Sequence, residues 1–168
     1  TSDDESMPTM TADGRYLYFT RHIGEGLYQD EDIYFAIATL AGFSKANNVG
    51  EVINTEQFIE GAQSISPSGK YLFFTSADRR DGVGRADIYM SRKVGDQWEK
   101  PNNMGMPVNT PGWDAQPCIS ADGRSLYFSS VQANGKGGAD IWVSNLNDDG
   151  TWGKPQNLGS SINTMYDE

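Results

Sequence analysis

The stretch Ala121-Asp-Gly-Arg-Ser-Leu-Tyr-Phe-Ser129 decides the fold, because the chain contains two near copies of it. The copies are Ala12-Asp-Gly-Arg-Tyr-Leu-Tyr-Phe-Thr20 and Pro67-Ser-Gly-Lys-Tyr-Leu-Phe-Phe-Thr75. Each copy holds a glycine at its third place, and these glycines are 55 and 54 residues apart: Gly14, Gly69 and Gly123. Self-similarity at a fixed period of this size indicates a repeat architecture.

Three further markers recur in constant order behind each copy. An Asp-Ile-aromatic triplet begins at Asp32, Asp87 and Asp140. An Asn-Thr pair begins at Asn54, Asn109 and Asn163. A Trp-x-Lys-Pro-x-Asn-x-Gly stretch begins at Trp98 and Trp152, and Phe43 begins its counterpart in the first unit. We therefore divide the chain into units 1–54, 55–109 and 110–163, with 164–168 starting a further repeat.

Each unit is predicted to contain four strands. The first is short (7–10, 63–66 and 116–120), and the Asp-Gly or Ser-Gly pair behind it predicts a tight turn. The second is aromatic and β-rich (16–20, 71–76 and 125–130). A long polar loop leads to the third strand at the Asp-Ile-aromatic triplet, and a weaker fourth lies around Phe43, Trp98 and Trp152. Four antiparallel strands per repeat of this length are typical of a blade, so we predict an all-β fold, a β-propeller with three blades in this chain.

The third unit resembles the WD-like propeller repeat of TolB-type proteins. The residues from Pro117 to Ser144 carry this resemblance, as Pro-x-Ile-Ser-Ala-Asp-Gly-Arg-x-Leu-Tyr-Phe-Ser-Ser followed by Asp-Ile-Trp-Val-Ser. The closing stretch from Trp152 is similar to that of envelope proteins with an OmpA-like domain. The resemblance implies a six-bladed ring in the periplasm or elsewhere in the bacterial cell envelope, or outside the cell, that docks proteins or cell-wall material.

Three blades would leave two open flanks, which is a liability for aggregation. Residues 1–5 match residues 110–114 and 164–168, so the chain spans three periods and a five-residue overlap. We expect two chains to join head to tail as a homodimer with six blades. The alternative is that the chain is a fragment of a longer propeller.

Composition excludes some partners. With 13 Lys and Arg against 23 Asp and Glu, the net charge is −10, so the chain repels nucleic acid. No apolar run is long enough to span a membrane. The single cysteine, Cys118, has no partner for an intrachain disulfide, and its place in an apolar strand predicts a small buried side chain.

Nothing in the sequence predicts catalysis. The single histidine, His22, excludes a multi-histidine metal site within one chain, and there is no Gly-x-Ser-x-Gly elbow. Acidic pairs such as Asp148 and Asp149 are common in loops, and the Asp- and Gly-rich loop 78–87 carries three arginines that oppose a cation. We expect no enzymatic activity, no cofactor and no metal.

A ligand is expected where the long loops meet. These are the connections from one blade to the next and the loops between the second and third strands, which share one face of a propeller. The candidates for binding a protein or glycan ligand are Phe58, Glu60, Trp113, Asp114 and Tyr166 from the connections, with His22, Arg79 and Arg80 from the loops. An aromatic beside an acid would stack a sugar or receive a cationic peptide, although the aromatics alternatively wedge between blades.

The recurring aspartates Asp32, Asp87 and Asp140 are expected to be structural instead. Each carboxylate would accept backbone N–H bonds and hold the loop before the third strand. The expected function is a non-catalytic binding or scaffold module. The alternatives are a carbohydrate-binding or carbohydrate-active propeller and a structural fragment of a larger envelope protein.

Overall fold

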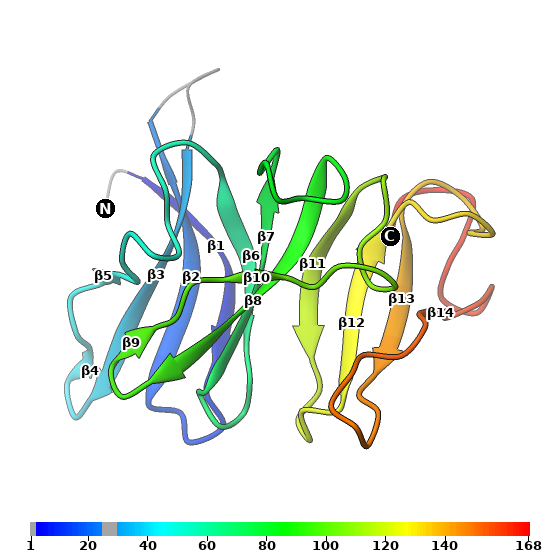
Figure 1. The fold of residues 1–168 in the computed structure, drawn as a ribbon. Coiled ribbons are helices and arrows are strands. Elements are labelled where there is room, and N and C mark those ends of the chain that lie inside the picture. Colours follow the sequence, from blue (N-terminus) through cyan, green and yellow to red (C-terminus); the bar gives the residue numbers. More distant parts are fainter. Residues whose placement is uncertain (1–2, 25–29) are drawn as a thin grey trace.

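The computed structural model describes residues 3–24 and 30–168, which form three antiparallel β-sheets standing side by side (Figure 1). The first sheet contains β1 (Asp4–Met10), β2 (Tyr16–Ile23), β3 (Asp30–Thr39), β4 (Gly42–Phe43) and β5 (Asn47–Asn48). The second contains β6 (Glu60–Ile65), β7 (Tyr71–Ala77), β8 (Ala86–Val94), β9 (Gln97–Trp98) and β10 (Asn102–Asn103). The third contains β11 (Asp114–Ile119), β12 (Ser125–Ser130), β13 (Asp140–Asn145) and β14 (Gln156–Asn157).

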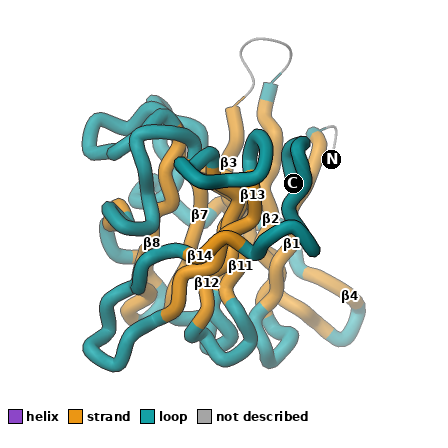
Figure 2. Tube along the Cα trace, turned by 90° about the vertical axis from the view of Figure 1, so that its right-hand side faces the viewer, coloured by secondary structure: helices purple, strands orange, loops and turns teal. Residues whose placement is uncertain are grey.

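Within each sheet the strands follow one another as neighbours, in the meander of a propeller blade. Figure 2 shows that the described chain consists of strands and loops, without a helix. The prediction of an all-β, blade-based fold is therefore confirmed. The fourth strand is discontinuous in the first two sheets. There it consists of two separate pieces of two residues, and both pieces pair with the third strand.

The first strand of each blade begins three residues earlier than its pattern predicts, or two in the third blade, because a β-bulge interrupts the alternation. The bulge residue is left-handed in all three blades: Met7 (φ 51°), Ala62 (φ 48°) and Gln116 (φ 54°). Its amide fastens one blade to the preceding one. Ala62 N–H donates to Thr20 Oγ1 at 3.0 Å, and Gln116 N–H donates to Thr75 Oγ1 at 3.0 Å.

The same bulge corrects the prediction for Cys118. After the irregularity between Ala115 and Cys118, the side chain of Cys118 is exposed, whereas Ile119 is buried. Cys118 lines an open groove that also contains Met7 and Ala62, the bulge residues of the other two blades. The expectation of a buried cysteine is wrong because simple alternation does not continue across the bulge.

The apolar core lies between neighbouring blades and repeats itself. At the first junction, Tyr18 and Ile33 of the first blade pack with side chains of the second, including Leu72, Phe74 and Tyr89. At the second junction the equivalent residues of the second and third blades pack in the same way: Phe73, Ile88, Leu126, Phe128 and Trp142. Burying each of these side chains contributes about 1.5–3 kcal/mol, so each blade is stabilised chiefly by its neighbour.

A buried asparagine at the end of each blade explains why the Asn-Thr marker recurs. Asn109 accepts from Ile88 N–H at 2.9 Å and donates to Ile88 O at 2.9 Å, and so replaces a strand partner. It also donates to Asn103 Oδ1, and Asn103 donates to Asp87 Oδ2. The same brace appears in the other blades through Asp32, Asn48 and Asn54, and through Asp140, Asn157 and Asn163.

The tight turns between the first two strands are alike in all three blades. Their glycines have positive φ angles, which other residues rarely adopt: Gly14 (67°), Gly69 (69°) and Gly123 (72°). These turns lie at the lower end of the sheets in Figure 1, and the long loops lie at the upper end. The two ends of the blades are therefore built differently.

Candidate functional site

The long loops form one continuous face. Arg85 N–H, in a loop between the second and third strands, donates to Gly112 O in a blade connection. Gly138 N–H likewise donates to Tyr166 O. We call the residues 50–59, 78–85, 105–113, 131–139 and 158–168 the loop face. Buried polar groups hold these loops, and their surface carries exposed apolar side chains together with exposed charged ones such as Glu51, Arg80 and Arg85.

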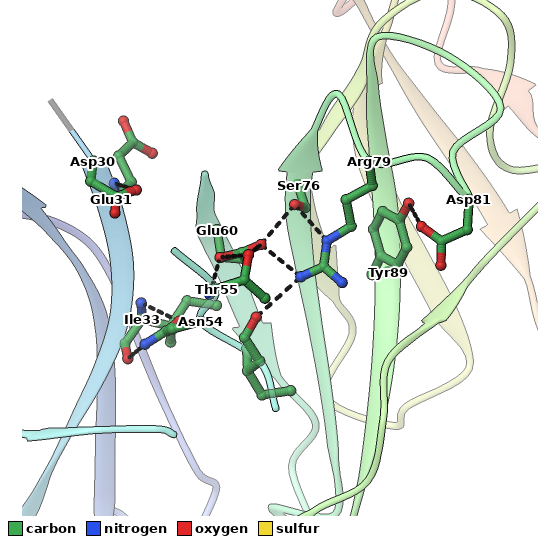
Figure 3. Close-up of polar contacts among 11 residues, drawn as sticks. Asp30, Glu31, Ile33, Asn54, Thr55, Glu60, Ser76, Arg79, Asp81 and Tyr89 are labelled. Atoms are coloured by element: carbon green, nitrogen blue, oxygen red, sulfur yellow. Dashed lines mark hydrogen bonds and ion pairs between the residues drawn. The ribbon is translucent and has the colours of Figure 1, made fainter. Parts of the chain in front are cut away.

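Glu60 and Arg79 form a buried ion pair (Figure 3). Arg79 Nη2 lies 2.6 Å from Glu60 Oε1 and 3.1 Å from Ile53 O, and the Glu60 side chain is fully buried. Thr55 N–H and Ser76 Oγ donate to the same carboxylate at 2.8 and 3.1 Å. Burial raises the pKa of Glu60, and the hydrogen bond from Arg79 opposes that rise. Both candidate ligand residues are thus engaged with each other.

Asp114 occupies the equivalent place in the next blade. Its buried carboxylate accepts Thr110 N–H at 2.6 Å and the hydroxyl of Ser130. Burial raises the pKa of Asp114. Glu168 receives Thr164 N–H at 2.9 Å in the same manner. A threonine four or five residues before each acid is the sequence signal for this latch, and sequence reasoning overlooked it.

The recurring aspartates lie at the start of the third strands, and two of them hold the loop ahead of the strand. Asp87 accepts Val83 N–H at 2.6 Å and Gly84 N–H at 3.1 Å, and Asp140 accepts Lys136 N–H. Asp32 accepts from Asn48 Nδ2 at 2.8 Å, whereas the loop ahead of it, 25–29, lies outside the described residues. Burial and the neighbouring carboxylate of Asp30 raise the pKa of Asp32.

The other candidates lie in different environments. Trp113 and Tyr166 are 36% and 71% exposed, and Arg80 is exposed beside the buried Arg79. Phe58 is half-buried beneath Arg79, whose guanidinium carbon lies 5.7 Å from the centre of the Phe58 ring.

His22 lies within β2, paired with Glu31 of β3, so its placement in a loop by the sequence pattern is wrong. Its ring nitrogens contact Ser6 Oγ at 2.9 Å and Glu31 Oε1 at 3.2 Å. The histidine therefore joins strands of the first blade.

The structure brings Trp113 together with Asp167 and Glu168 around an open cavity of about 430 Å³. Val131, half-exposed, lines the same cavity. Other large apolar side chains of the loop face are also exposed: Val52, Ile59, Val83, Met106, Met165 and Tyr166. Exposed apolar surface of this kind is typical of interaction sites.

In residues 3–24 and 30–168, no group of three or more His, Cys, Asp or Glu side chains is placed to hold a metal ion. The same residues contain no helix that is long and apolar enough to cross a membrane.

Comparisons with known proteins agree with the blade architecture. No family model matches the sequence, and no curated protein matches it significantly. Among solved structures, TolB from Acinetobacter baumannii matches 90% of this chain and 31% of its own length, with a TM-score of 0.60 and 16% identity. A putative TolB from Agrobacterium tumefaciens matches 95% of this chain and 63% of its own length, with a TM-score of 0.55 and 16% identity.

A puromycin-hydrolyzing peptidase from Mycobacterium tuberculosis is also similar, over 94% of this chain and 23% of its own length, with a TM-score of 0.56 and 15% identity. The chain thus spans less than two thirds of each of these proteins. At such identities the likeness concerns the fold, which occurs in proteins of different activity. The chain has a TolB-like β-propeller fold and contains three consecutive blades.

Proposed function

We propose that the chain is a non-catalytic binding module that docks a protein partner on its loop face, in the bacterial periplasm or cell envelope. One observation carries the proposal, the presence of many exposed apolar side chains on loops that are anchored by buried polar groups. A surface of this kind is preorganised, so little loop ordering opposes binding. The TolB-like fold supports the location and the role in protein interaction.

The test compares two double variants that each remove two exposed apolar side chains. Trp113→Ala with Tyr166→Ala changes the loop face, and Leu40→Ala with Val94→Ala changes exposed hairpin residues at the other end. Pull-down from bacterial envelope extract is followed by mass spectrometry and by direct binding to the purified partner. We expect the wild type and the hairpin variant to bind the same partner and the loop variant to lose it. Equal binding by both variants would refute the proposal.

A second candidate function is carbohydrate binding. It is favoured by the position of Trp113 beside the carboxylates of Asp167 and Glu168 around one cavity. An indole face stacks on a sugar ring while acids receive its hydroxyls. Screening a glycan panel tests it, because a genuine hit must weaken when Trp113 is replaced by alanine. A panel without any hit would leave the protein-docking proposal as the better account.

We also propose that two copies of the chain close head to tail into a six-bladed ring. Equivalent positions of the three blades differ in exposure according to whether a neighbouring blade covers them. Tyr127 is 37% exposed where Phe73 is 3%, and Ile162 is 50% exposed where Val108 is 0%. On the other flank, Met10 is 43% exposed where Ile65 is 3%. The two flanks therefore present the two complementary halves of an internal junction.

Light scattering on a sizing column tests the ring. We expect twice the mass of one chain, and we expect Ile162→Asp to halve it. Val94→Asp is the control, because Val94 is equally exposed but lies on a hairpin away from the flank. A wild-type monomer at micromolar concentration would exclude the two-chain ring.

A further inference from the structure

The two blade junctions of this chain contain equivalent aromatic side chains, which we call the aromatic frame, but the side chain that lies between these rings differs. At the first junction, Trp98 meets Tyr18 edge-on, with ring centres 6.3 Å apart. At the second, Trp152 meets Phe73 edge-on at 6.0 Å. The equivalence follows from the strand register, since Trp98 pairs with Lys93 and Trp152 pairs with Leu146. The frame is thus built twice by the same chain.

At the first junction the frame holds an internal cation. The ammonium of Lys93 lies 5.0 Å from the ring centre of Tyr16 and 5.5 Å from that of Trp98. This is the distance at which a cation is attracted by the faces of aromatic rings. At the second junction the corresponding rings belong to Tyr71 and Trp152, and Leu146 replaces the lysine. The rings remain, and among the described residues that line this place none carries an ammonium group.

The second junction also lacks a hydrogen bond between the tight turns of its two blades. At the first junction, Ala12 N–H donates to Pro67 O at 3.2 Å and joins the tight turns of the two blades. At the second, Pro67 takes the place of Ala12, and proline has no N–H to donate. A second replacement enlarges the same space: a Cβ on Gly69 would meet the γ-methyl of Thr11 at 3.3 Å, whereas Ser66 takes the place of Thr11 at the second junction and a Cβ on Gly123 would meet nothing within 4 Å.

The result is a cavity of about 460 Å³ between the second and third blades, at the end opposite the loop face. Tyr71, Phe73, Met90 and Trp152 line it, and Asp122 lies at its rim. The hydrogen bond from Ser120 lowers the pKa of Asp122, so its carboxylate is ionised at neutral pH. The volume suits a small organic molecule.

We propose that this cavity binds an alkylammonium group on an apolar stem, seated between Tyr71 and Trp152 as Lys93 is seated between Tyr16 and Trp98. The aromatic faces and the Asp122 carboxylate select the positive charge, and the apolar walls receive the stem. The site is separate from the loop face and does not depend on the function proposed for it.

Titration with hexyltrimethylammonium tests the proposal on protein labelled with ¹³C at its methionine methyl groups. We expect a saturable shift of the Met90 resonance. Met106 and Met165, 76% and 73% exposed on the loop face, report on unspecific attraction to this acidic chain. The matched probes are n-hexanol and hexanoate, which have the same stem without the positive charge. Equal binding of either probe, or parallel shifts of Met106 and Met165, would overturn the proposal.

Substitutions at the two junctions test whether the ligand binds in this cavity. Leu146→Lys supplies an internal ammonium and is expected to abolish the Met90 shift, whereas Lys93→Leu changes the other junction and leaves it intact. Tyr71→Ser, at a partly exposed position, is expected to weaken binding about threefold. A Leu146→Lys protein that is folded and still binds would refute the site. A further titration with acetyl-lysine methylamide distinguishes two origins of the alkylammonium group, both of which agree with the proposal. Binding of this compound indicates a lysine side chain of another protein as the natural ligand, and absence of binding indicates a free organic cation.

Discussion

Replacing Arg79 by methionine tests the buried polar structure of the loop face. The substitution keeps much of the stem but leaves the fully buried Glu60 carboxylate without its counter-charge. Breaking a buried ion pair in this way costs about 3–5 kcal/mol. Urea unfolding followed by tryptophan fluorescence measures this loss as a shift in midpoint at constant slope. We expect Arg80→Met, at the exposed neighbouring position, to change the free energy of unfolding by less than about 0.5 kcal/mol.

The pH dependence has a definite sign. The pKa of Glu60 is raised in the folded chain, so protonating this group favours folding, and that contribution is lost as the pH rises through the folded pKa. Without Arg79 the pKa rises further, because the hydrogen bond and charge that lower it are gone. The deficit of Arg79→Met relative to wild type should therefore shrink as the pH falls from neutral toward 4.5, the ordinary value for glutamate.

The pair is confirmed by adding Glu60→Gln to Arg79→Met. The double variant should be more stable than Arg79→Met alone, because no charge then remains buried. Equal stability of the Arg79→Met and Arg80→Met proteins would refute this reasoning. So would a deficit of Arg79→Met that does not change with pH.

Three other outcomes are expected. Asn109→Ala should lower the free energy of unfolding by about 2 kcal/mol in urea titration, because it leaves the buried N–H of Ile88 without its partner, whereas Ile88 O still accepts from Met104 N–H. Gly84→Ala should lower the melting temperature, since its Cβ would collide with the backbone oxygens of Thr110 and Gly112; a change within error of wild type would contradict this placement. Cys118 should react with a thiol reagent in the native protein as fast as in urea, because its side chain is exposed.

The recurrence of blades was readable from the sequence because its signals are local. The glycine turn, the aromatic second strand and the Asp-Ile-aromatic triplet each act within about ten residues, and three copies reinforce one another. The bulges were not readable in the same way. An extra residue such as Ala62 breaks the alternation on which strand assignment rests, and its amide is satisfied by Thr20 of another blade.

The composition of the loop face was readable from the sequence, but the environment of its residues was not. Phe58 and Tyr166 each stand two residues before a latch acid, Glu60 or Glu168, yet the tertiary structure half-buries the first beneath Arg79 and leaves the second 71% exposed. The alkylammonium cavity depends likewise on Pro67 and Leu146, which lie 79 residues apart and meet only when two blades pack. Local pattern determines strands and turns, whereas exposure and open space depend on neighbours that lie far away in the chain and that only packing brings together.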